Sequence, residues 1–294
     1  MTAGWSMVRM AARVMISAAR SIPFMPMPEQ AKALFLPAGN IASTLSDCTV
    51  ISVTLFLNKL RCLCVVCGRE LGRKERHICL DCLVGMPLTY HWLKPENPMA
   101  DKFNSLIAKD YDGPEYYALA TALFDFEKGT GYRHITHNLK YRHNIPAGRF
   151  FARMLAKHLV ETFGNARVQF PDIPPVDAVV PVPLHWTRLL SRGYNQAEII
   201  ASEIASELKA PLRKDLLTRR QRTHTQTSLN VEEKKANVSG AFAVNPKASL
   251  KGLRHLLLVD DVFTTGSTLY NCFRPLRQAA GPGLRISIAT LGAV

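Results

Sequence analysis

The segment Leu256–Thr268 combines the residue types best suited to chemistry in this chain. Four apolar residues lead into two adjacent carboxylates, Asp260 and Asp261, and hydroxyl residues with one glycine follow. Backbone N–H groups at a helix start, together with Thr and Ser hydroxyls, bind phosphate without a cation, and Gly266 lets the backbone approach a ligand closely. Because ligands of α/β sheets bind beyond the carboxyl ends of strands, the carboxylates would stand where the ribose hydroxyls of a 5-phosphosugar lie. The alternative is an ordinary strand-to-helix turn capped by Asp and Thr.

Four cysteines form two C-x-x-C pairs separated by eleven residues. They are Cys64, Cys67, Cys79 and Cys82. Each pair can form a tight turn whose thiolates point to one side, and two such turns make a closed tetrahedral zinc site. Because four thiolates leave no open position, we expect the zinc to be structural; free thiols or a redox pair are the alternatives. Cys62 and His77 break the paired spacing and are predicted not to be ligands.

A basic segment follows the apolar run Val176–Val182. It contains Pro183, Leu184, His185, Arg188 and Arg192. Its arginines supply positive charge, and the start of a helix at Asn195 supplies backbone N–H groups for an anion. We interpret the segment as a loop that binds a diphosphate. A solvated basic turn is the alternative.

A second basic stretch runs from Arg219 to Asn237 and has few apolar residues. We single out Arg222, Thr225, Gln226 and Lys234. Such a stretch could be a mobile lid that closes over a reacting diphosphate. It could equally be a solvated basic face or a track for a nucleic-acid backbone.

Alternating strands and helices must position these segments. The apolar runs are typical of buried strands, and the stretches between them have helical periodicity. This alternation predicts a mainly parallel sheet with helices on its faces. The expected strands are 116–126, 176–182, 256–259 and 285–291, and the expected helices are 131–141, 148–163, 195–208 and one that begins after Ser267.

Composition excludes several classes of protein. The chain has 294 residues, of which 47% are hydrophobic, so it can bury a core and is not a disordered polymer. A formal net charge of +14 indicates a polyanionic partner, such as nucleic acid or a phosphorylated small molecule. The longest apolar run, 48–57, is too short for a membrane helix. We therefore expect a soluble protein without stable membrane insertion.

The sequence divides into three predicted parts. Residues 1–47 are rich in Met, Ala, Arg and Pro, and we expect a poorly ordered extension or an overcalled start rather than a targeting segment or an interfacial helix. Residues 48–98 hold the cysteine pairs, and Pro87, Pro95 and Pro98 predict a linker at their end. Residues 99–294 would form the α/β domain.

The string Leu256–Thr268 resembles the phosphoribosyl diphosphate (PRPP) motif of type I phosphoribosyltransferases. Together with the other motifs it resembles the ComF family, bacterial competence-associated proteins with a four-cysteine zinc module and a C-terminal phosphoribosyltransferase domain. The extension before Cys48 and the lysine at Lys234, where arginine is common, depart from the family pattern. The further motifs are Leu139-Lys140-Tyr141-Arg142, Pro181-Val182-Pro183-Leu184, Arg192-Gly193-Tyr194-Asn195-Gln196, Thr225-Gln226-Thr227 and Asn237-Val238.

The resemblance implies an α/β type I phosphoribosyltransferase fold and a set of site residues. Asp260 and Asp261 would hold the ribose 2- and 3-hydroxyls, and they would be the catalytic residues together with Arg192. Mg²⁺ would enter with PRPP, held largely by substrate oxygens and water. The residues implied for the 5-phosphate are Thr264, Thr265, Gly266, Ser267 and Thr268.

Two functions follow from the resemblance. The first is a cytoplasmic transferase that moves phosphoribosyl from PRPP to an unknown acceptor, releases diphosphate and is linked to DNA uptake in natural transformation. The second is a non-catalytic competence protein that binds single-stranded DNA and DNA-uptake proteins, with PRPP as a regulatory ligand. For the second, bases would need aromatic stacking platforms, and we expect Tyr141, Trp186 and Tyr194 to serve packing instead.

Overall fold

The computed structural model describes residues 62–127, 129–163, 173–219 and 241–294. The predicted extension and the predicted lid residues Arg222, Thr225, Gln226 and Lys234 lie outside this part of the chain. The described residues fall within one compact unit, Leu60–Val294. The boundary between a cysteine module and an α/β domain at 98/99 stays a prediction.

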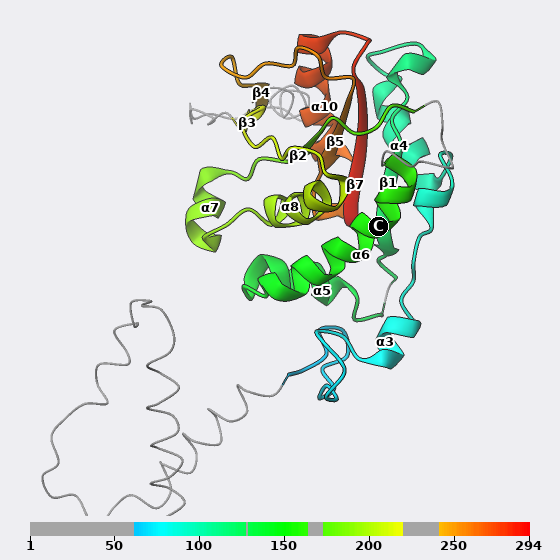
Figure 1. The fold of residues 1–294 in the computed structure, drawn as a ribbon, viewed down its shortest axis with the longest axis vertical. Coiled ribbons are helices and arrows are strands. Elements are labelled where there is room, and N and C mark those ends of the chain that lie inside the picture. Colours follow the sequence, from blue (N-terminus) through cyan, green and yellow to red (C-terminus); the bar gives the residue numbers. More distant parts are fainter. Residues whose placement is uncertain (1–61, 128, 164–172, 220–240) are drawn as a thin grey trace, which may run out of the picture. The chain divides into compact units, whose positions relative to one another are not determined.

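A parallel sheet forms the centre of the fold (Figure 1). Its strands lie in the order β1-β7-β5-β2, with β6 also pairing with β7, and every pairing is parallel. This confirms the mainly parallel sheet predicted from the sequence. The strands are β1 (Ala120–Asp125), β2 (Ala178–Pro181), β5 (His255–Val259), β6 (Val262–Phe263) and β7 (Arg285–Ala293).

Helices cover both faces of the sheet, as the alternating pattern predicted. Along β5, Leu257 and Val259 pack in the same cluster as α6 (Ile145–Phe163) and α8 (Gln196–Leu208). Leu256 and Leu258 point to the other face, where α4 (Pro98–Ile107) and α10 (Ser267–Ala280) lie. Because side chains alternate along a strand, both faces must be apolar, and all five residues of β5 are buried.

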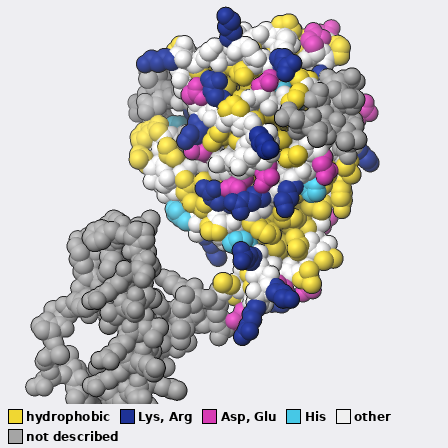
Figure 2. All heavy atoms as spheres, viewed as in Figure 1, with side chains coloured by type: hydrophobic (Ala, Val, Ile, Leu, Met, Phe, Trp, Pro, Cys, Tyr) yellow, Lys and Arg dark blue, Asp and Glu magenta, His cyan; other side chains and the backbone are white. Residues whose placement is uncertain are grey.

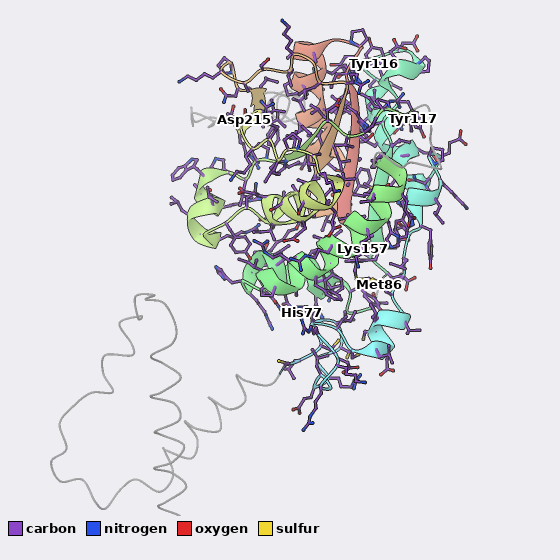
Figure 3. All side chains as sticks on the ribbon, in the orientation of Figure 1. His77, Met86, Tyr116, Tyr117, Lys157 and Asp215 are labelled. Atoms are coloured by element: carbon purple, nitrogen blue, oxygen red, sulfur yellow. The ribbon has the colours of Figure 1, made fainter. Side chains whose placement is uncertain are left out.

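The cysteine segment packs on the same core as α6. Val65, Val66 and Ile78 are buried in one cluster with the side chains of α6, and the His77 ring is tilted against that of Phe150 with ring centroids 5.6 Å apart. Figure 3 shows His77 and Met86 beside α5 (Arg133–Tyr141) and α6. A short helix, α3 (Leu80–Val84), begins directly after Cys79 and contains Cys82. The cysteine segment therefore shares one hydrophobic cluster with α6.

The linker predicted around Pro87, Pro95 and Pro98 is a packed segment in the structure. Trp92, in the 3-10 helix η2 (His91–Leu93), is buried and stacks on His158 of α6. Pro98 begins α4, where a proline is tolerated because the first helical N–H has no intrahelical acceptor. The prolines here mark turns and a helix start, which the sequence pattern could not separate from a linker.

The remaining elements were absent from the sequence prediction or differ from it in length. Part of the basic segment after β2 is a helix, and the expected strand 116–126 is shorter because its beginning is a 3-10 turn. The further elements are η3 (Pro114–Tyr116), α7 (Trp186–Arg192), β3 (Leu217–Arg219) and β4 (Phe242–Val244).

No helix among the described residues has the length and apolar character needed to cross a membrane.

The contact between the cysteine segment and the start of α5 can be tested at Gly131. A Cβ at this position would lie 2.2 Å from the carbonyl oxygen of Val66, so Gly131→Ala must push the two backbones apart. We expect the free energy of unfolding to fall by about 1–3 kcal/mol, the usual cost of overpacking. Gly283→Ala is the matched control, because a Cβ there meets nothing within 4 Å. Equal unfolding midpoints for the two variants in denaturant would contradict this packing.

Candidate functional site

Asp260 and Asp261 stand at the carboxyl end of β5. Their backbones remain paired with β7, since Asp260 N donates to Ala289 O at 3.1 Å and Asp261 O accepts from Leu291 N at 3.1 Å. Asp261 N also donates to the Asp260 carboxylate at 2.9 Å. Burial, and then the neighbouring charge of Asp261, raise the pKa of Asp260 above its usual range. Two carboxylates are thus held side by side, with Asp261 buried and Asp260 partly exposed.

Lys140, in the last turn of α5, supplies positive charge to this pair. Its Nζ lies 2.6 Å from Asp261 Oδ2, and the side chains of Lys140 and Asp261 are 25% and 6% exposed. The charge of Lys140 lowers the pKa of Asp260, opposing the effect of burial. From the sequence, Lys140 was expected among the basic residues near the strand ends of one site, but its contact with Asp261 was not predicted. Its partner lies on a different element, far away in sequence, so no local spacing could have indicated the contact.

The hydroxyl residues form an exposed turn at the start of α10. Thr264, Thr265, Ser267 and Thr268 are all exposed, and the Thr265 and Ser267 hydroxyls lie 2.9 Å apart. Gly266 precedes the helix with a φ of 76°, and a Cβ there would lie 2.9 Å from the Phe263 ring. A side chain at this position is therefore excluded by both conformation and space. The turn presents exposed hydroxyls at a helix start, where backbone N–H groups and hydroxyls together can bind a phosphate.

The basic segment after β2 contains α7 where the sequence predicted a loop. Pro183, Leu184 and His185 precede this helix, and His185 Nδ1 accepts from Thr187 N at 3.4 Å as its cap. Arg188 is exposed on the helix. Asn195 caps α8 by accepting from Ala197 N at 3.1 Å, as expected for a helix start. The segment thus offers a helix start and basic side chains.

Arg192 is held against the end of α5. Its guanidinium lies 4.9 Å from the centre of the Tyr141 ring, a cation–π contact. One terminal nitrogen of Arg192 is buried and has no hydrogen-bond partner among the described residues. Buried polar groups are normally paired, so this nitrogen is suited to an anionic ligand.

Arg219, at the end of β3, is the part of the predicted lid that the structure describes. Burial and the charge of Arg188 lower the pKa of Arg219, while the charge of Asp260 raises it. Arg219 therefore lies within the electrostatic influence of both Arg188 and Asp260.

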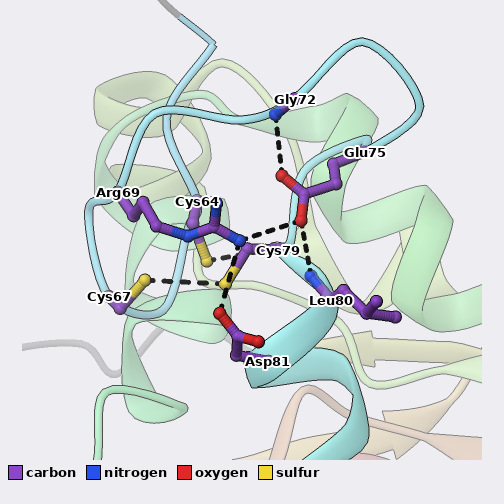
Figure 4. Close-up of polar contacts among 8 residues, drawn as sticks. All are labelled: Cys64, Cys67, Arg69, Gly72, Glu75, Cys79, Leu80 and Asp81. Carbon is purple, nitrogen blue, oxygen red and sulfur yellow. Dashed lines mark hydrogen bonds and ion pairs between the residues drawn. The ribbon is translucent and has the colours of Figure 1, made fainter.

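The four paired cysteines come together as the spacing predicted. Their sulfur atoms all lie within 4.8 Å of one another, and no other His, Cys, Asp or Glu joins this group in the described part of the chain. Cys79 N donates to Cys64 Sγ at 3.3 Å, and Glu75 accepts from Leu80 N and Gly72 N, both at 2.7 Å (Figure 4). N–H donors of this kind stabilise thiolates, the form that binds a metal. The cluster could hold a structural metal such as zinc.

Comparison with known proteins identifies relatives of this chain. No family model matches it. Competence protein F of Haemophilus influenzae is 29% identical over 144 residues, which cover 49% of this chain and 61% of that protein. The DNA utilization protein YhgH of Escherichia coli K12 is 27% identical over 207 residues, covering 70% of this chain and 80% of its own length.

The chain is thus similar in sequence to proteins named for competence and DNA utilization. This confirms the resemblance predicted from the motifs. Solved structures of adenine phosphoribosyltransferases from Leishmania tarentolae and Trypanosoma brucei align at 14% identity, with TM-scores of 0.26 and 0.27. The alignments cover 55% and 67% of this chain and 76% and 79% of those chains. The fold described above rests on its own sheet order and helices.

Metal analysis tests the cysteine cluster of this protein. We expect about one metal ion per chain, which Cys79→Ser should release together with several kcal/mol of stability, because metal binding is coupled to folding. Cys62→Ser is the matched control, since Cys62 is an exposed thiol outside the cluster. Metal content by mass spectrometry and thermal unfolding with and without chelator are the measurements. Equal metal content in both variants would exclude the assignment.

Proposed function

We propose that this domain binds PRPP and transfers its phosphoribosyl group to an unidentified acceptor with release of diphosphate. One observation carries the proposal: two adjacent carboxylates end a buried strand, and an exposed turn of hydroxyls at a helix start follows them directly. Such an arrangement would set groups for the ribose hydroxyls beside groups for a 5-phosphate. The relatives named for competence and DNA utilization support a link to DNA uptake.

Each residue of the site would act on one part of PRPP. Asp260 and Asp261 would accept hydrogen bonds from the ribose 2- and 3-hydroxyls, and the turn from Thr264 to Thr268 would bind the 5-phosphate. Arg188 and Arg192, with the backbone at Pro183, Leu184 and His185, would stabilise the departing diphosphate. In the transfer the acceptor forms a bond to the anomeric carbon, the carbon–oxygen bond to diphosphate breaks, and the acceptor proton is lost.

Two metals belong to this proposal. Mg²⁺ would enter with PRPP, and the oxygen-rich surroundings of Asp260 and Asp261 suit this hard cation. It would supply charge to the leaving diphosphate. In the cysteine cluster we propose zinc, because four thiolates match its tetrahedral preference. Free thiols at all described cysteines are in keeping with a cytoplasmic protein.

A second function, binding of single-stranded DNA, is favoured by the exposure of two aromatic side chains. Tyr141 and Trp186 are 59% and 49% exposed, contrary to the packing role we expected. Tyr194 does pack, since its hydroxyl donates to Leu139 O. Figure 2 shows hydrophobic side chains at the left edge of the molecule, where α7 lies in Figure 1. An exposed ring on the same helix as the exposed Arg188, as at Trp186, is what sequence-independent base stacking requires.

Ligand binding to the full chain tests the PRPP site. We expect PRPP with Mg²⁺ to raise the thermal unfolding midpoint, and Asp261→Asn to weaken binding about 10- to 100-fold through loss of a charged acceptor. Glu198→Gln is the matched control. Glu198 lies on α8, and its Oε1 pairs with Lys214 Nζ at 2.8 Å. Absence of any PRPP effect on the wild-type midpoint would refute the proposal, whereas a shift without diphosphate release would support the regulatory role.

Fluorescence anisotropy with a labelled oligothymidylate tests the DNA function. Trp186→Ala should weaken binding about 5- to 100-fold, the loss expected for one base stacked on an aromatic ring, and affinity should fall steeply with salt. Tyr90→Ala is the control, because Tyr90 is 52% exposed but lies on the turn before η2. If both variants bind the oligonucleotide like the wild type, α7 is not the DNA surface.

A further inference from the structure

Three consecutive residues at the end of α5 each contact a different part of the candidate site. Leu139 O accepts from the Tyr194 hydroxyl, Lys140 Nζ approaches Asp261 Oδ2 at 2.6 Å, and the Tyr141 ring carries the guanidinium of Arg192. The acid pair and the basic segment are thus joined through one helical turn. Lys140 stands in the middle of these contacts.

The rest of α5 is also fixed. At its beginning, the Tyr132 hydroxyl donates to Cys82 O at 2.8 Å, and His134 Nδ1 lies 3.3 Å from Val66 O. Toward its end, the Leu139 side chain fills the space above Gly148 of α6, where a Cβ would lie 2.6 Å away. The backbone that carries Lys140 is therefore held by the cysteine turns on one side and by α6 on the other.

The Lys140 ammonium offsets negative charge at the Asp260 and Asp261 carboxylates. Asp260 and Asp261 are adjacent, Asp261 is buried and Asp260 is partly exposed, so their mutual repulsion is screened by water only in part. PRPP adds further negative charge at the same place. A fixed ammonium beside Asp261 offsets this charge and directs one carboxylate oxygen, which leaves the rest of the pair free to accept from a ligand.

We propose that Lys140 is a positioning residue for PRPP binding, which acts through Asp261 by holding its carboxylate charged and oriented. This inference rests on the proposed PRPP site and deepens it. Lys140 is not a general surface lysine, because its contact with Asp261 is set by anchors at both ends of α5. Its effect on the ligand is transmitted by the carboxylate.

A double-mutant cycle on the full chain tests this role. PRPP affinity in the presence of Mg²⁺ is measured by calorimetry for the wild type, Lys140→Met, Asp261→Asn and the double variant. We expect Lys140→Met alone to weaken binding about 10- to 100-fold, but to change affinity less than about 3-fold in the Asp261→Asn background, because coupled residues are not additive. Lys140→Arg should restore most of the affinity, since it keeps the charge.

Controls separate this role from others. Lys157→Met removes an exposed lysine from α6 (Figure 3) and should leave the affinity unchanged. Additive losses in the cycle would mean that Lys140 contacts the ligand itself, which would overturn the positioning role. Equal PRPP affinity of Lys140→Met and the wild type would also overturn it. Should Lys140→Met fail to fold, Lys140→Gln replaces it, and the unfolding midpoint without ligand is recorded for every variant. Wild-type protein that binds no PRPP would instead reject the proposed function together with this inference.

Discussion

The central constraint on this structure is the charge of two adjacent carboxylates at the end of a fully buried strand. Removing one ion from water costs several kcal/mol in a protein interior, and a second like charge beside it adds to that cost. The structure answers with Lys140 at 2.6 Å from Asp261 and with the backbone N–H of Asp261, which donates to the Asp260 carboxylate at 2.9 Å. The arrangement of α5 follows from this requirement, because a lysine compensates a buried charge only if its backbone stays in place.

Placing that backbone gives the cysteine segment a role in the α/β domain. Cys82 and Val66, one in each cysteine turn, present their carbonyls to Tyr132 and His134 at the start of α5. Val65 and Ile78 belong to the same core as α6. A metal that fixes the two turns would therefore also fix the helix that carries Lys140. The free energy of metal binding would contribute to the order of the acid pair as well as to the fold of the turns themselves.

Local patterns predicted the elements of the site well, and long-range contacts account for what they missed. The apolar run before Asp260 became β5, and the stripe of Phe151, Leu155 and Leu159 became the buried face of α6. Such periodicities report which face of an element is buried. They contain no information on the partner of a single polar residue, so the contact of Lys140 with Asp261 was not predicted. Exposure of Trp186 was also unpredictable, because whether a ring is covered depends on elements elsewhere in the chain.

The basic excess of the chain divides into two kinds of charge in the structure. Some arginines neutralise buried or nearby acids, as where Arg149 and Arg153 both bind Glu203 between α6 and α8, in a region where Figure 2 shows basic side chains gathered. Arg188 and Arg192 differ, because neither forms an ion pair with any residue that the structure describes. Cations left without protein anions beside a strand end are free to bind an anionic ligand. PRPP would use this charge without any nucleic acid, and a DNA strand would have to reach the same unpaired arginines from α7. The two proposed functions therefore compete for one set of charges.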